Sequence, residues 1–177
     1  MQPQLPIDVD PDSGVWRTNG LPMLYVPRHF FINNHLAMEA ALGRYPYADA
    51  LYQAGHRSAH YWCASEAATH GLTGLAVFEH YLSRLSLRGW GRFRFLEADV
   101  ARGNAHIRLD HSCFVLAQGE AGAPQSEHMA CYLFAGWFAG AMDWVGESLG
   151  RDYRTVSRES QCAGQGAPYC AFSVHPL

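Results

Sequence analysis

The sequence predicts an α+β domain in which an antiparallel sheet packs against helices. The predicted elements are, in order, a short β segment, three helices, a β meander, one more helix and a terminal β hairpin. Strands and helices are therefore grouped along the chain, which is typical of antiparallel α+β folds and not of alternating parallel α/β folds. The chain has 177 residues, of which 49% are hydrophobic, enough for one domain with a full-sized core.

The N-terminal residues predict an extended arm followed by a short hairpin. Residues 1–14 contain three prolines, which exclude a helix, and we expect a weakly ordered arm there. Asn19-Gly20 is a hairpin turn signal between two short apolar segments. The arm and short strands are expected in residues 1–30, and the main domain in residues 31–177.

The next part of the chain has apolar residues at helical spacing. This pattern predicts three helices, over residues 30–43, 47–70 and 75–88. Gly43 and Gly71 lie where the first two helices end, a common place for glycine. The second helix carries small residues three to four positions apart, which would let another backbone approach closely.

A β meander and an apolar helix precede the terminal hairpin. Alternating apolar residues predict meander strands over residues 91–100 and 105–118. Ser126 is a suitable N-cap for a helix that runs to Gly150. Because this helix is almost wholly apolar, with Gly136 and Gly140 at helical spacing, we expect close contact with another helix or a symmetry mate.

Composition excludes several functional classes. The formal net charge is −3 and only 16% of residues are charged, so nucleic-acid binding has no basic face to use. No apolar run reaches membrane-spanning length, and the acidic, proline-rich N-terminus is unlike a signal peptide. We therefore expect a cytoplasmic, bacterial protein, without membrane contact, whose five cysteines are thiols or ligands and not disulfides.

Four residues have the spacing of a metal site. Glu159, Cys162 and Cys170 form an E-x2-C-x7-C pattern, and Cys131 lies 28 positions before the glutamate. Zinc binds thiolates and carboxylates, and four protein ligands make a closed structural site. Glu159 would face away from Cys162 on a regular strand, so a bulge or bend is required. Spacing alone leaves two alternatives open: buried free thiols, or a disulfide between Cys162 and Cys170.

Two other groups of chemically capable residues have simpler interpretations. His56, His60 and Cys63 share one helix face, which suits either a second metal site or, preferably, a half-buried polar stripe facing the sheet. Cys113 is expected in a strand beside His111. A nucleophilic Cys/His pair needs a third orienting group, and none is evident, so Cys113 is interpreted as a core cysteine.

Residues from about 47 to the end resemble the 4-vinyl reductase domain family. Its C-terminal signature is a glutamate, a short gap, a cysteine, a glycine-bearing tip and a last cysteine, matched by Glu159, Cys162 and Cys170. The same module is the effector-sensing domain of phenol- and xylene-responsive bacterial activators, which bind zinc with a Cys, Glu, Cys, Cys set. The resemblance therefore implies a structural Zn2+ site, with Cys131 as the first ligand.

The resemblance also implies a fold similar to the TRAPP-type vesicle-tethering subunits, which is usually a homodimer with a hydrophobic pocket. In this chain we expect the C-terminal hairpin to be held by the zinc ion. In the aromatic sensors, a histidine on the helix before the meander and an aromatic residue on a meander strand touch the ligand. The nearest positions are His80, beside Tyr81, and the stretch from Arg108 to His111. Since the strand tryptophan is missing, we expect an anionic or zwitterionic ligand. The alternative is that His80 simply packs and Arg108 is solvated.

These observations predict a zinc-stabilised, small-molecule-binding domain of sensor or accessory type, with a hydrophobic or amphipathic pocket and no catalytic residues. Its expected partners are the ligand, a second copy of the chain and a partner enzyme. The alternative is a subunit or accessory enzyme of a reductive or N-methyl-amine demethylation pathway. Residues 6–31 resemble stand-alone bacterial proteins of unknown function that look like companions of dimethylglycine-type demethylation systems.

Overall fold

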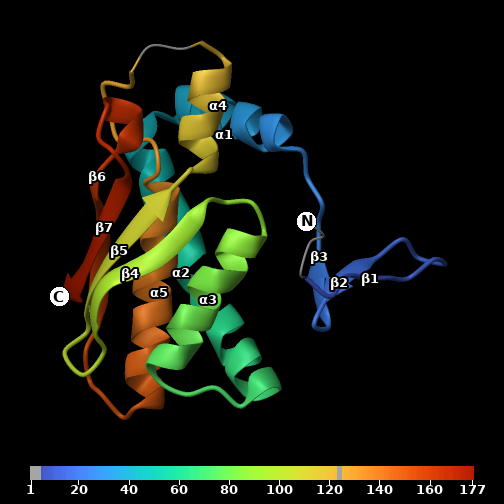
Figure 1. Cartoon of the computed structure of the whole chain (residues 1–177), viewed down its shortest axis with the longest axis vertical. Helices are drawn as coiled ribbons and strands as arrows, with labels where there is room; N and C mark the ends of the chain where they lie inside the picture. Colours follow the sequence, from blue (N-terminus) through green and yellow to red (C-terminus); the bar gives the residue numbers. More distant parts are fainter. Residues whose placement is uncertain (1–4, 123–124) are drawn as a thin grey trace.

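The computed structural model describes residues 5–122 and 125–177, and it has the predicted α+β architecture (Figure 1). The elements in chain order are β1 (Asp8–Val9), β2 (Trp16–Thr18), β3 (Leu21–Met23), α1 (Arg28–Leu42), α2 (Arg44–His70), α3 (Leu75–Leu87), β4 (Arg92–Asp99), β5 (Asn104–Asp110), α4 (Cys113–Glu120), α5 (Leu133–Ser148), β6 (Thr155–Gln161), a 3-10 turn (Ala163–Gln165) and β7 (Cys170–Pro176). The three helices expected between the N-terminal hairpin and the meander are confirmed as α1, α2 and α3.

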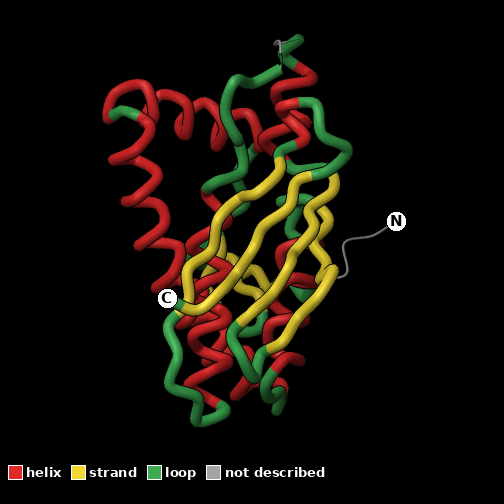
Figure 2. The backbone as a smooth tube through the Cα atoms, turned by 90° about the vertical axis from the view of Figure 1, so that its left-hand side faces the viewer, coloured by secondary structure: helices red, strands yellow, loops and turns green. Residues whose placement is uncertain are grey.

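The main sheet is antiparallel, with strand order β4-β5-β7-β6. Its residues alternate: Ala105, Ile107 and Leu109 of β5 are buried, and the residues between them are more exposed. The buried face packs on α3 and α5, and α2 packs in turn on α5. Figure 2 shows the sheet in front and these helices behind it. The terminal hairpin is confirmed as the β6–β7 pair.

The N-terminal segment forms a small sheet that projects from the main body (Figure 1). The hairpin at Asn19-Gly20 is confirmed, because β2 and β3 pair across it. The prediction of a weakly ordered arm was wrong for residues 8–14, since β1 pairs with β2. The Asp10 carboxylate accepts hydrogen bonds from Asp12 N and Ser13 Oγ, and this local turn directs β1 back onto β2. Residues 1–4 lie outside the described residues.

The second meander strand is shorter than predicted. It ends at Asp110, and the residues expected to continue it form α4. His111 has a positive φ of 56°, which turns the chain, and the Ser112 hydroxyl accepts a hydrogen bond from Phe114 N as an N-cap. Cys113 is therefore the first residue of a helix and not part of a strand. It is buried, so its interpretation as a core cysteine is confirmed.

The apolar helix starts later than predicted, at Leu133 and not after Ser126. Backbone N–H groups at both ends of the segment before α5 bond to the terminal hairpin. Ser126 N donates to Gly164 O at 2.8 Å, and Cys131 N donates to the Glu159 carboxylate at 2.9 Å. Residues 125–132 therefore run over the hairpin tip as a non-helical segment, because these tertiary hydrogen bonds replace the helical ones.

Helices α2 and α5 pack backbone to backbone. A Cβ atom at Gly136 would overlap the carbonyl oxygen of Tyr52, and one at Gly140 would overlap that of His56. On the other helix, a Cβ at Gly55 would overlap the Trp137 ring. The expected close contact of the apolar helix is therefore made within the chain, with α2, and only glycine fits at these positions.

We predict that Gly136→Ala lowers the free energy of unfolding by about 1–3 kcal/mol, because the new methyl group forces α2 and α5 apart. Gly119→Ala in α4 is the matched control, since no atom lies within 4 Å of the added Cβ. That control should be neutral or raise stability by up to about 1 kcal/mol, from helix propensity alone. Urea unfolding followed by circular dichroism measures both, and equal midpoints for the two variants would contradict the packing argument.

Candidate metal centre and ligand site

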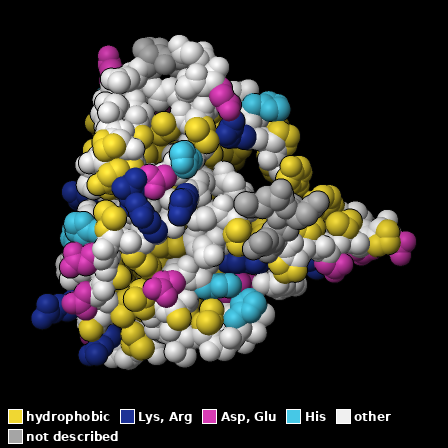
Figure 3. Space-filling model, in the orientation of Figure 1, with side chains coloured by type: hydrophobic (Ala, Val, Ile, Leu, Met, Phe, Trp, Pro, Cys, Tyr) yellow, Lys and Arg dark blue, Asp and Glu magenta, His cyan; other side chains and the backbone are white. Residues whose placement is uncertain are grey.

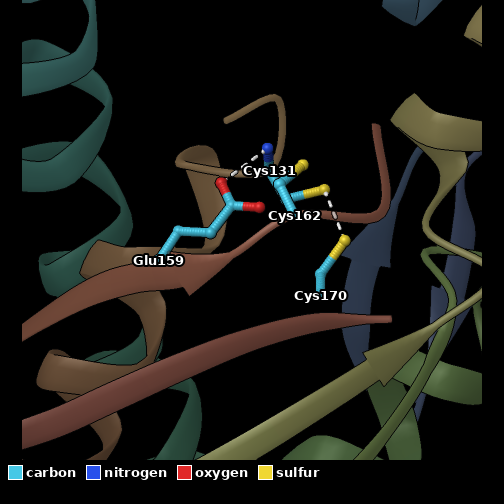
Figure 4. A group of neighbouring side chains, drawn as sticks. All are labelled: Cys131, Glu159, Cys162 and Cys170. Carbon is cyan, nitrogen blue, oxygen red and sulfur yellow. Dashed lines mark hydrogen bonds between the residues drawn. The ribbon is translucent and has the colours of Figure 1, made fainter. Parts of the chain in front are cut away.

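Cys131, Glu159, Cys162 and Cys170 come together at the tip of the terminal hairpin, where their ligand atoms all lie within 4.8 Å of one another. Figure 4 shows the three sulfur atoms and the carboxylate facing a common point. The Cys131 and Cys170 sulfur atoms are 3.6 Å apart. Two thiolates at about 2.3 Å from a tetrahedral zinc ion would be separated by nearly the same distance.

Local irregularities of the chain bring these side chains together. The β6–β7 register shifts between Glu159 and Gln161, which is the bulge that the sequence required. The bulge turns Glu159 toward Cys162, the residue just after β6, while Cys170 begins β7. Cys131 arrives from the segment that runs over the tip, just before α5.

Backbone groups around the cluster are arranged to support negatively charged ligands. Ala130 N donates to Cys162 Sγ and Ala163 N donates to Cys170 Sγ, each at 3.3 Å. Glu159 is only 9% exposed, and its Oε1 atom has no hydrogen-bond partner among the described residues. An unpaired, buried carboxylate oxygen beside three sulfur atoms fits a metal ligand. All five cysteines are free thiols, so the structure has no disulfide between Cys162 and Cys170.

Electrostatics within the cluster also favour a bound cation. Hydrogen bonds from Cys131 and Cys170 lower the pKa of the Cys162 thiol, so a first thiolate forms easily. Burial, together with the Cys162 charge, raises the pKa of Glu159 to about 9. Hydrogen bonds to Cys162 and Cys170 raise the pKa of Cys131. Without a cation the cluster therefore carries little more than one negative charge, and a cation would allow the remaining ligands to ionise.

The histidines on the polar face of α2 pair with carboxylates of α5. His56 Nε2 lies 2.9 Å from Asp143 Oδ2, and His60 Nε2 lies 2.8 Å from Glu147 Oε2. Their interpretation as a polar stripe is confirmed, but the stripe faces α5 and not the sheet. Cys63, one turn further along, is fully buried.

The predicted ligand residues lie at two separate places. His80 and Tyr81 are on α3, where the His80 and Tyr81 rings lie 5.7 and 4.8 Å from the Trp62 ring. Arg108 lies on the other face of the sheet, bonded to Asp110 and stacked over Tyr169 at 3.9 Å. His111 is exposed in the turn after β5. The structure therefore brings His80 and Tyr81 together, but not with Arg108 or His111.

Sequence reasoning missed the polar group around His80, which we call the α2–α3 polar cluster. His80 Nε2 lies 2.8 Å from Glu66 Oε2, and His70 Nε2 lies 3.3 Å from the same oxygen. Its members come from α2, α3 and the residue just after α3: Trp62, Glu66, His70, His80, Arg84 and Arg88. The sequence pattern that could have indicated this cluster is that Glu66, Arg84 and Arg88 interrupt otherwise apolar faces at helical spacing.

Two hollows open near the non-helical segment, and neither is lined by His80 or Tyr81. The first, of about 680 Å3, lies between α2, β6 and residues 127–132, and Glu159 is part of its wall. The second, of about 640 Å3, lies between α1, α4 and residues 125–132.

Within residues 5–122 and 125–177, the helices are all too short or too polar to span a bilayer.

The chain belongs to the family described as "Domain of unknown function (DUF5943)", whose model matches residues 1–96. A search of curated proteins finds no significant relative. Several solved structures are similar in fold. The phenol-responsive sensory domain of the transcription activator PoxR, solved with phenol, matches with a TM-score of 0.78 and 14% identity, over 96% of this chain and 84% of that chain.

Two further structures have the same architecture. A vinyl-4-reductase family protein from Methanocaldococcus jannaschii matches with a TM-score of 0.55 and 16% identity, over 88% of this chain and 84% of that one. A trafficking protein particle complex subunit 3 from Naegleria fowleri, covalently bound to palmitic acid, matches with a TM-score of 0.57 and 11% identity, over 85% and 95%. The expected likeness to vinyl-reductase-type and TRAPP-type folds is therefore confirmed.

We predict that, once any metal has been removed with a chelator, Cys162 is the first thiol to be alkylated by iodoacetamide at pH 7. Cys162 is as buried as Cys63 and Cys113, so exposure does not distinguish the three, but its lowered pKa favours the thiolate, which is the reactive form. Cys63 and Cys113 should stay unmodified, because burial raises both pKa values, that of Cys113 to about 12. Peptide mapping by mass spectrometry measures the order, and modification of Cys113 as fast as that of Cys162 would contradict it.

Proposed function

We propose that this chain is a zinc-stabilised, small-molecule-binding domain with a sensor or accessory role. The single observation that carries the proposal is the match to the phenol-responsive sensory domain, which extends over 96% of the chain. In this proposal the ligand-binding domain comprises residues 31–177, and residues 1–30 form the N-terminal strands. A bacterial, cytoplasmic location, where thiols stay reduced, suits the five free cysteines.

Zinc is the metal that best suits the cluster at the hairpin tip. Three sulfur donors and one carboxylate would be held by Cys131, Glu159, Cys162 and Cys170, and soft thiolates favour zinc over magnesium or calcium. Four protein ligands leave no position for substrate, so the bound ion would be structural. The proposed zinc joins the hairpin to the segment before α5, and its binding free energy contributes to folding.

We predict one zinc per chain, and loss of that zinc in Cys162→Ser, because a hydroxyl group is a far weaker zinc ligand than a thiolate. The variant should also melt at a lower temperature, since the hairpin tip loses its link to residues 125–132. Cys113→Ala is the matched control and should keep its zinc. Metal analysis of both proteins by mass spectrometry is the measurement, and a metal-free wild type would refute the proposal.

The proposed ligand contacts are His80 and Tyr81 for a molecule bound beside α2 and α3. Support comes from their contact with the Trp62 ring, which offers an apolar wall next to polar groups. Arg108 and His111 stay predictions for a different molecule or partner, at the open face of the sheet. Arg108 is held by Asp110, so a ligand there would have to compete with that ion pair.

We also propose that the domain is a homodimer and that it has a partner enzyme. Support comes from the large apolar side chains exposed on the N-terminal sheet, on α1 and on the segment between them, where Leu24 is 87% and Tyr25 is 83% exposed. Figure 3 shows hydrophobic side chains along the projecting N-terminal segment. Exposed apolar surface of this kind is typical of protein–protein contacts.

An accessory enzyme of a reductive or N-methyl-amine demethylation pathway is the second candidate. It is favoured by the fold match to a vinyl-4-reductase family protein. Such an enzyme would need a redox cofactor, and the absorbance spectrum of the purified protein separates the two functions. A flavin or haem band would favour the enzyme.

We predict that a small aromatic or amphipathic molecule raises the melting temperature of the protein, since a ligand that binds only the folded state stabilises it. A thermal-shift screen of phenols, carboxylates, amines and betaines measures this effect. Native mass spectrometry of the same samples should show a dimer that carries the ligand. A monomer that no compound stabilises would contradict the proposed function.

A further inference from the structure

The α2–α3 polar cluster contains charged groups that the fold buries but does not satisfy. Glu66 is fully buried and Arg84 is 6% exposed. Arg84 Nε lies 3.9 Å from Glu66 Oε2, too far for a hydrogen bond. The Arg88 guanidinium lies over the Trp62 ring at 5.7 Å. These four side chains therefore form one contiguous group inside the packing of α2 against α3.

Six buried polar atoms of this group have no hydrogen-bond partner among the described residues. Five are donors and one is an acceptor: Arg84 Nε and Nη2, Arg88 Nε and Nη2, Trp62 Nε1 and, as the acceptor, Glu66 Oε1. Native proteins rarely leave buried donors unpaired, because such a donor has lost its hydrogen bonds to water without a replacement. Buried donors are otherwise paired with protein groups, ordered water or a ligand, so this many unpaired donors in one place suit a bound molecule that supplies acceptors.

The charges indicate which kind of molecule this is. Arg84 and Arg88 carry two positive charges, and Glu66 is the only carboxylate that faces them within the described residues. Arg84, Arg88 and Glu66 together therefore have an excess of one positive charge. Burial and the neighbouring Arg84 also lower the pKa of Arg88, as expected for uncompensated positive charge. One bound carboxylate would neutralise the cluster, and its two oxygens suit guanidinium groups.

We propose that the α2–α3 polar cluster binds the carboxylate group of a small organic acid. Arg84 and Arg88 donate to the carboxylate oxygens, and the Trp62 indole N–H adds a neutral donor. The Trp62 and Tyr81 rings, 4.8 Å apart, supply an apolar surface for the body of the acid. The cluster reaches solvent beside His70 and His80, whose side chains are 34% and 25% exposed. The inference rests on the proposed ligand-binding function and gives its ligand a chemical class.

A metal ion at the same place is the competing interpretation. Glu66, His70 and His80 offer one carboxylate and two imidazoles within 4.8 Å, a set that could hold a metal ion. A divalent cation would raise the charge excess from one to three beside two buried guanidinium groups. It would also leave the arginine and tryptophan donors unpaired. The charges and the unpaired donors both favour the carboxylate.

The test uses benzoate and benzamide, which have almost the same shape but differ in charge. Calorimetric titration of the full chain should show that benzoate binds and that benzamide binds at least about tenfold more weakly. Arg84→Gln and Arg88→Gln should each weaken benzoate binding by at least about tenfold. Arg57→Gln, an exposed arginine on α2, is the matched control and should bind benzoate as the wild type does. If the buried Arg84→Gln variant does not fold, the half-buried Arg88→Gln carries the test.

Three outcomes would overturn the inference. The first is equal binding of benzoate and benzamide, and the second is unchanged benzoate binding in both arginine variants. The third is benzoate binding only after a metal is added, with loss of that metal in His70→Ala. If neutral phenols bind but no carboxylate does, the inference fails and the proposed function stands. If neither class binds, the proposed function fails as well.

Discussion

The contact between α2 and α5 is the constraint on which the rest of the structure depends. Three glycines allow this close approach: at Gly136 and Gly140 the two helices touch backbone to backbone, and Gly55 leaves room for the Trp137 ring. Because α5 packs directly on β6, this contact fixes α2 relative to the sheet. Both candidate sites follow from it, since Cys131 leads into α5 and Glu66 lies on the last turns of α2.

The two candidate sites have an excess of opposite charge. At the hairpin tip, thiols and a carboxylate are gathered around one point, and a cation there would make the ionisation of all four favourable. Between α2 and α3, two guanidinium groups share their surroundings with one carboxylate, so positive charge is in excess. The first group holds backbone segments together, and the second is placed beside aromatic rings at an edge that solvent reaches. A structural role for the first and a ligand-binding role for the second are consistent with these differences.

Local patterns in the sequence predicted much of the fold and the metal cluster, and the errors have a common physical cause. The glycines spaced along the apolar helix predicted its close packing, and the E-x2-C-x7-C spacing predicted the metal cluster. Each of these patterns lies within one helix or one hairpin, so it can be recognised locally. Ser126 looked like an N-cap, but Cys131 N, which a helix starting there would have used, bonds to Glu159, 28 residues later. Ser112, instead, caps a helix where alternation predicted a strand. The α2–α3 polar cluster was missed because its members come from α2, α3 and the residue just after α3, and unpaired atoms are visible only after the helices have packed.

The length of α2 gives the molecule a mechanical property. Its 27 residues form a rod of roughly 40 Å, clamped along its middle by α5. A ligand at the far end of such a rod cannot tilt it without separating the glycine contacts. We therefore expect the response to occupancy to occur where the packing is lighter, in the N-terminal sheet, whose Asn19 side chain touches His70 at 3.1 Å. In this arrangement α2 stays fixed, and the projecting N-terminal sheet is the part that could move and contact a partner.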